Sequence, residues 1–187
     1  MIRLIKSGRV WADGRLQDVD LLITAEGKIA ALTEKPLDST QLGDDVIDAT
    51  GSLVFPGGID VHAHLEDGAE TYYEASCAAA VGGITTVVDM PPFHVCSTPE
   101  GMRERTKLAD KECVVDFGTH GGIVVGLSDL VEMAAVAKEG AAGFKGFMPA
   151  EPPVSREVLW GAVQTAARTG LRLVIHAEES ACLEKEV

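Results

Sequence analysis

The pattern of hydrophobic and polar positions changes near residue 50. The first part of the chain contains short strand-like runs separated by turn residues, at 2–5, 19–24, 28–32 and 46–48. Such short runs bury little surface by themselves. We therefore expect residues 1–51 to form a small antiparallel sheet and not an independent domain.

From residue 52 onward, apolar strands alternate with helices. The pattern predicts strands at 53–64, 84–89, 113–117, 123–125, 143–147 and 171–176, and helices at 72–81, 99–112, 128–138 and 155–169. Thr98 followed by Pro99 is a typical helix start, Ser128 is expected to cap the third helix, and Gly170 follows the last one. Apolar strands alternating with helices are typical of a parallel sheet covered by helices.

Residues 52–187 contain about five such β/α units. A complete eight-stranded (β/α) barrel needs roughly 250 residues. The pattern therefore predicts either a smaller open sheet or an incomplete barrel, and the chemical motifs described below favour the incomplete barrel.

Charge and composition narrow the class of protein. The chain has 16 Lys and Arg against 29 Asp and Glu, a net charge of −13. Nucleic-acid and anionic-membrane binding need clustered cations, so neither partner is expected. No apolar run approaches the ~18 residues of a membrane span, and the N-terminus has no signal-peptide pattern. The four cysteines are scattered, which predicts reduced thiols and a cytoplasmic protein.

The first apolar strand of this region ends in Asp60-Val61-His62-Ala63-His64. Side chains alternate along a strand, so His62 and His64 share one face with Asp60. Two imidazoles at this spacing can hold one metal ion, and barrel enzymes carry their chemistry at the C-terminal ends of strands. A bare histidine pair is more often structural, but the preceding Pro-Gly-Gly and Asp60 favour a metal site. Asp60 either supports an imidazole or is an ordinary strand residue.

A single charged residue, Lys145, lies inside the apolar strand 143–147. A buried ammonium group is costly unless it is paired or neutralised. Reaction with CO₂ would convert the amine into a carbamate that can bridge two divalent ions. The alternative is a lysine that extends along the strand to reach solvent.

The remaining histidines are less informative one by one. His176 ends the strand 171–176, as a metal ligand would, although a lone histidine there is more often structural. Glu178 and Glu179 are expected at a helix start, where the helix dipole favours acidic residues. His120 is expected in a loop or a packing role, and His94 at the surface or at a pocket rim.

Together these motifs resemble the cyclic amidohydrolases of the amidohydrolase superfamily. The similar segments are PGGIDVHAHLEDG at 56–68, AAAVGGITTVVDMP at 78–91, GFKGFM at 143–148 and VIHAEE at 174–179. The resemblance covers almost the whole chain. It implies that residues 1–51 are the N-terminal portion of a β-sandwich domain and that residues 52–187 are the first part of a TIM (β/α)₈ barrel.

The resemblance also implies a metal centre and a reaction. His62 and His64 would bind one of two divalent ions, zinc being expected, His176 would bind the other, and carbamylated Lys145 would bridge them. A metal-bridging hydroxide would hydrolyse a ring C–N bond of a small cyclic amide or ureide. A further metal-binding histidine and the general-base aspartate are implied beyond residue 187, so the 187-residue chain alone is expected to be inactive, and the full-length parent to be a homo-oligomer.

An allantoinase-like activity is expected, and other branches of the family remain open as alternatives. The segment VDMPP resembles the allantoinase branch more than the hydantoinase branch. Dihydroorotases usually carry an arginine soon after H-x-H to bind the substrate carboxylate, where this chain has Leu65-Glu66-Asp67. Hydantoinase (dihydropyrimidinase) and dihydroorotase activities are therefore alternatives. A non-catalytic structural or regulatory relative is less consistent with the retained ligands, and no phosphate-binding glycine motif supports a nucleotide-binding domain.

Overall fold

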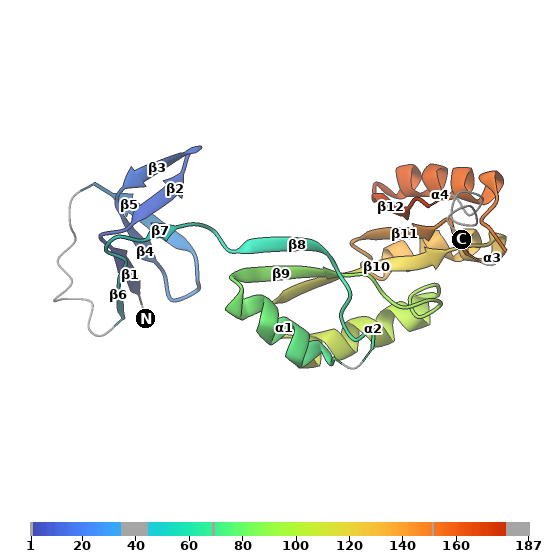
Figure 1. Cartoon of the computed structure of the whole chain (residues 1–187), viewed down its shortest axis with the longest axis horizontal. Coiled ribbons are helices and arrows are strands. Elements are labelled where there is room, and N and C mark those ends of the chain that lie inside the picture. The colour runs from blue at the N-terminus through green and yellow to red at the C-terminus, as the bar shows by residue number, and fades with distance from the viewer. Residues whose placement is uncertain (1, 35–44, 69, 151, 179–187) are drawn as a thin grey trace, which may run out of the picture. The chain divides into compact units, whose positions relative to one another are not determined.

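The computed structural model describes residues 2–34, 45–68, 70–150 and 152–178. The chain divides into two compact units, Met1–Pro56 and Gly57–Val187, whose elements are labelled in Figure 1. The boundary falls after Pro56 and not after residue 51, because strand β7 (Leu53–Val54) pairs with β2 (Arg9–Ala12) of the first unit. The strand predicted at 53–64 is therefore two strands, β7 and β8 (Gly58–Ala63).

The first unit contains two small mixed sheets, with strand orders β5-β4-β1-β6 and β3-β2-β7. Strand β1 (Arg3–Lys6) pairs antiparallel with β4 (Asp20–Ile23), and β5 (Ile29–Thr33) continues that arrangement. However, β6 (Val46–Asp48) is parallel to β1, as β7 is to β2, so the prediction of one antiparallel sheet is wrong. Side chains of both sheets share a core that includes Val10, Leu21 and Val54, as in a β-sandwich.

The hydrophobic pattern did not predict the hairpin formed by β2 and β3 (Arg15–Asp18). Its turn is Asp13-Gly14, with φ of +50° and +75°. Positive φ at both central residues is the type I′ turn that suits a two-residue hairpin. The Asp-Gly pair was therefore the sequence signal for this hairpin.

The second unit is a five-stranded parallel sheet of order β12-β11-β10-β9-β8, as predicted. Helices connect its strands (Figure 1). The strands after β8 are β9 (Ile84–Asp89), β10 (Asp116–Val124), β11 (Gly143–Phe147) and β12 (Leu173–His176). The helices are α1 (Tyr72–Val81), α2 (Pro99–Glu112), α3 (Leu127–Lys138) and α4 (Arg156–Thr169). Because all five strands run the same way, their C-terminal ends lie at one edge of the sheet.

Two predictions in this unit were wrong in detail. Strand β10 is continuous where two strands with an intervening loop were expected, because its residues 120–122 pair with β11. Helix α3 has its N-cap at Gly126 and not at Ser128. The reason is Asp129, whose carboxylate accepts the backbone N–H groups of Val125 and Gly126, each at 2.9 Å.

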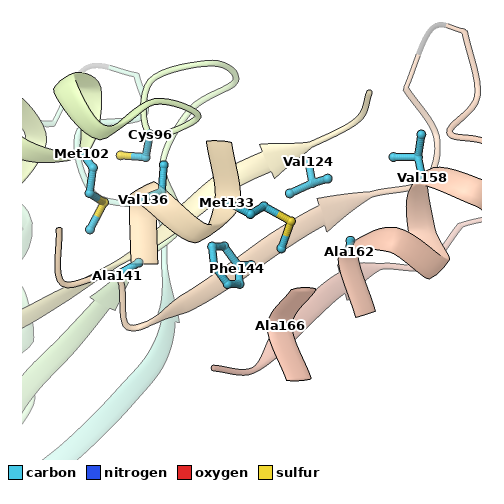
Figure 2. Close-up of a cluster of buried hydrophobic side chains, with 10 residues drawn as sticks. All are labelled: Cys96, Met102, Val124, Met133, Val136, Ala141, Phe144, Val158, Ala162 and Ala166. Carbon is cyan, nitrogen blue, oxygen red and sulfur yellow. The ribbon is translucent and has the colours of Figure 1, made fainter. Parts of the chain in front are cut away.

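A hydrophobic core lies between the strands and helices α3 and α4 (Figure 2). Phe144 of β11 is fully buried there, beside Met133 and Val136 of α3. Successive side chains of a strand point to opposite faces, so burying Phe144 against the helices directs Lys145 to the other face of the sheet. No helix within the described ranges is long and apolar enough to cross a membrane.

The start of α2 gives a first testable prediction. Thr98 is the N-cap as expected, and its Oγ1 accepts the backbone N–H of Gly101 at 3.2 Å. Thr98→Ala should lower the free energy of unfolding by about 1 kcal/mol, because this helical N–H loses its partner. Thr98→Ser should retain most of the stability. Urea unfolding followed by circular dichroism measures both, and equal stability of the alanine variant would contradict the prediction.

Candidate metal centre

Strand β8 brings two histidines to the C-terminal edge of the sheet. The ring centroids of His62 and His64 lie 5.5 Å apart, and both residues are exposed. Asp60 Oδ1 accepts the backbone N–H of His62 at 3.0 Å, a contact to the strand backbone. The two imidazoles are thus neighbours, as the H-x-H spacing predicts.

Asp67 contacts the second of these histidines. Nδ1 of His64 lies 3.1 Å from Oδ2 of Asp67, where an imidazole N–H can donate to the carboxylate. With the proton on Nδ1, the lone pair of Nε2 is free to bind a metal ion. This role of Asp67 was not predicted, although its position three residues after a candidate ligand could have indicated it.

Lys145 lies inside β11 and is only 4% exposed, so it does not extend along the strand to solvent. Burial lowers the pKa of its amine. In the part of the chain that the structure describes, no carboxylate forms an ion pair with it. The side chain is therefore a buried amine without a compensating negative charge, an arrangement that favours the neutral form.

His176 ends β12, next to β11 in the sheet. Its ring centroid lies 4.7 Å from that of Phe147, and its Nε2 is 2.7 Å from Oε2 of Glu178. Glu178 therefore contacts the histidine, and the helix that it was expected to start falls on residues outside the described part of the chain. Glu179 lies outside the described residues.

Most of these side chains, though not those of His62 and Glu178, line a pocket of about 330 Å³. Its polar lining consists of His64, Asp67, Lys145 and His176, and its apolar lining of Met90, Pro91, Pro92, Phe93, Ile123 and Phe147. Burial, followed by the charge of Lys145, lowers the pKa of His62. The charges of His64 and His176 act in the same direction, so His62 is within electrostatic range of the other three residues.

The structure therefore brings the four predicted site residues to one region of the sheet. Among the described residues, no group of three or more His, Cys, Asp or Glu side chains is placed to hold a metal ion without the lysine. The candidate centre is instead the combination of His62 at the end of β8, His64 just after it, the amine from β11 and one histidine from β12.

His120, expected in a loop or in a packing role, is a buried residue of β10, which agrees with the packing role. Its Nδ1 has no hydrogen-bond partner in the described structure. Burial lowers the pKa of His120, although a hydrogen bond with the Val61 backbone opposes this effect. Gly143 on β11 leaves room for the ring, since a Cβ there would lie 2.8 Å from Nδ1. The strand pattern gave no signal for this contact because the Gly121-Gly122 pair resembles a turn.

Comparison with known proteins assigns the family. A model described as "Amidohydrolase family" matches residues 53–187. A dihydroorotase from Methanosarcina mazei is 34% identical over 184 residues, which cover 94% of this chain and 39% of that protein. An L-hydantoinase from Paenarthrobacter aurescens is 33% identical, covering 97% of this chain and 41% of that protein. The chain belongs to the amidohydrolase family, which confirms the resemblance seen in its motifs.

Solved structures agree on the fold. A D-hydantoinase matches with a TM-score of 0.81 and 29% identity, over 98% of this chain and 42% of that chain. A dihydropyrimidinase from Brevibacillus agri matches with a TM-score of 0.83 and 28% identity, over 98% and 41%. The expected part of a (β/α)₈ barrel, preceded by part of a β-sandwich, is confirmed. The chain spans about two fifths of the length of these relatives.

The buried His120 predicts a dependence of stability on pH. Its pKa in the folded protein lies below its unfolded value of about 6.5, so folding favours the neutral ring. The contribution of His120 to stability is fully present above the unfolded pKa. It is lost as the pH falls through that value, because the unfolded chain binds the proton first. His120→Gln should show a smaller loss of stability between about pH 7.5 and pH 5.

His94→Asn is the matched control, because His94 is exposed and has a φ of +65° that asparagine tolerates. It should retain the parental pH dependence of the urea midpoint. An identical pH dependence in His120→Gln and the parent would show that His120 does not titrate on unfolding.

Proposed function

We propose that this chain forms part of a metal-dependent hydrolase that opens a ring C–N bond of a cyclic amide or ureide. The observation that carries the proposal is the buried amine of Lys145, which faces a pocket shared with His64 and His176. Membership of the amidohydrolase family supports it. So do the relatives named dihydroorotase and L-hydantoinase, which act on cyclic amides.

The residues present fit two divalent metal ions, with zinc as the expected metal. His62 and His64 would hold one ion and His176 the other, because imidazole nitrogen is a preferred zinc ligand. A carbamate on Lys145 would supply the anionic oxygens between them. Bound there, the ions would provide Lewis acidity and lower the pKa of a water molecule.

Lys145 has the surroundings that this modification needs. Its neutral amine nitrogen would attack the carbon of CO₂, forming an N–C bond while one C=O electron pair moves to oxygen. The nitrogen then releases a proton to water, which leaves an anionic carbamate in place of a potential cation. Only 4% of the residue is exposed, and this environment disfavours the ammonium form that cannot react.

Other residues in and beside the pocket would orient the ligands and the substrate. Asp67 holds the His64 ring through Nδ1, and Glu178 contacts His176. Phe93 packs edge-on against Phe147, with ring centroids 5.0 Å apart. This aromatic pair would exclude water from one side of the substrate ring.

The apolar wall favours a ring with a neutral substituent. In the pocket lining that the structure describes, the basic side chains are Lys145 and two histidines, all assigned here to metal binding, and no arginine is present. Leu65-Glu66-Asp67 stands where dihydroorotases usually carry an arginine. We therefore favour neutral cyclic ureides, the class that includes hydantoins and allantoin. Dihydroorotate is the second candidate, because relatives at 34% identity are named dihydroorotase.

The role of Lys145 can be tested in the natural full-length protein. Lys145→Ala should remove bound metal and lower kcat/KM by at least about 100-fold, since even residues that only support metal ligands contribute 10–100-fold. A short carboxylic acid in solution should partly restore both by occupying the bridging position. Metal content by elemental analysis and ring-opening rates are the two measurements.

Lys145→Arg is the matched control, because a guanidinium keeps its charge and cannot form a carbamate. It should be as inactive as the alanine variant and should not respond to the acid. Full metal content and a normal rate in Lys145→Ala would make Lys145 an ordinary structural residue.

Substrate preference is tested by comparing kcat/KM for a hydantoin with an apolar 5-substituent and for dihydroorotate. The hydantoin should be the better substrate, and Phe93→Ala should reduce its kcat/KM by about fivefold, because aromatic contacts of this kind contribute about 1 kcal/mol beyond burial. The same variant should change the rate with an unsubstituted hydantoin much less. Preference for dihydroorotate would instead support the dihydroorotase alternative.

A further inference from the structure

A buried polar cluster lies outside the pocket, behind the loop that follows His64. It consists of Asp89 at the end of β9, Tyr72 at the start of α1 and Arg105 in α2. Asp89 and Tyr72 are 0% exposed and Arg105 is 7% exposed. Burying an ion pair carries a large desolvation cost, so such a pair is weak evidence for stability alone.

The three side chains hold one another in a defined geometry. Oδ2 of Asp89 accepts the hydroxyl of Tyr72 at 2.7 Å and the Nε–H of Arg105 at 2.9 Å. The guanidinium carbon of Arg105 lies 4.7 Å from the centroid of the Tyr72 ring. Burial, followed by the charge of Asp89, raises the pKa of Tyr72, so its hydroxyl remains a donor. Each of the three groups thus contacts the other two.

Asp89 and Arg105 also form hydrogen bonds with the backbone of Leu65. Oδ1 of Asp89 accepts the backbone N–H of Leu65 at 3.2 Å, and Nη2 of Arg105 donates to its carbonyl oxygen at 2.5 Å. Nη1 of Arg105 also approaches Oε2 of Glu66 at 3.4 Å. Glu66 has a φ of +50°, an uncommon conformation for this residue type, which marks a sharp change of chain direction.

Leu65 lies in the chain between His64 and Asp67, the residue whose carboxylate orients the His64 ring. His64 precedes it, and Asp67, which contacts Nδ1 of His64, follows two residues later. A displacement of Leu65 would therefore move the histidine and its orienting carboxylate relative to each other. Metal ligands need to be held to within about 0.5 Å for productive binding.

We propose that the buried Asp89–Arg105 pair, braced by Tyr72, is a positioning device that holds Leu65 and thereby sets the His64 imidazole for metal binding. This inference rests on the proposed function, because it assigns His64 as a metal ligand. The three residues act through the loop backbone and do not contact the metal or the substrate.

Two conservative substitutions break this arrangement in different ways. Asp89→Asn keeps the shape of the side chain but replaces one acceptor oxygen with a donor amide. In either amide orientation, that donor faces another donor, from Leu65 or from Tyr72 and Arg105. Arg105→Lys keeps the positive charge, but one ammonium group cannot reproduce the planar fork that reaches both Asp89 and the Leu65 carbonyl.

The experiment measures Co²⁺ binding by the natural full-length protein after removal of its metal, using the visible absorption of bound Co²⁺. Asp89→Asn and Arg105→Lys should each raise the dissociation constant about tenfold, the lower limit for residues that support metal ligands. Their Co²⁺ absorption spectra should also differ from that of the parent, because the His64 ring is reoriented. Tyr72→Phe removes one hydroxyl and keeps the ring beneath Arg105, so it should raise the Co²⁺ dissociation constant less. It provides a milder change to the same cluster in case the Asp89 variant does not fold.

Met133→Ala is the stability control. Met133 is buried in the core between β11 and α3, away from the Leu65 loop, so its loss should lower the melting temperature without changing the Co²⁺ constant or spectrum. A parental constant and spectrum in both Asp89→Asn and Arg105→Lys would overturn this inference and leave the proposed function intact. If the parent protein did not bind Co²⁺, both this inference and the proposed function would be overturned.

Discussion

The alternation of side chains along β11 is the constraint on which the site depends. Phe144 is buried in the core that joins the sheet to α3 and α4, and this core needs an apolar residue at that position. The next residue, Lys145, is consequently directed to the opposite face, where the pocket lies. The same packing that stabilises the second unit therefore holds an amine away from water, beside the histidines of β8 and β12.

Polar groups are distributed on both sides of the C-terminal edge of the sheet. The pocket side carries the candidate ligands, which are half-exposed or exposed except for the lysine. The side facing α1 and α2 carries Asp89, whose hydrogen bonds are satisfied within the protein. Residues that are available to bind ions are therefore separate from residues that hold the backbone in place. Asp89, at the end of β9, is one of the residues that hold the backbone.

Local patterns predicted much of the second unit from the sequence. The bounds of α1, α2, β9 and β11 agree with the structure. The first helix and the two strands are apolar runs with a glycine at one end, and α2 begins at the Thr98-Pro99 cap. The H-x-H spacing also placed His62 and His64 together. The continuity of β10 was not predicted, because Gly121-Gly122 has the composition of a turn and only the pairing with β11 reveals a strand.

Long-range contacts account for the rest of what was missed. Nothing local connects Arg105 with Leu65, which are 40 positions apart, or His120 with the backbone of β8. The roles of these residues depend on how the sheet curls and on which helices cover it. By contrast, the Asp13-Gly14 hairpin was encoded locally and could have been predicted from its turn residues.

The glycine at position 143 has a consequence for how this protein can vary. A methyl group there would lie 2.8 Å from the ring of His120 and 3.0 Å from the carbonyl oxygen of Arg172. The imidazole of His120 on β10 thus occupies space that is open only because residue 143 on β11 has no side chain. A larger residue at 143 requires a smaller one at 120, so residues 120 and 143 are expected to be substituted together or not at all.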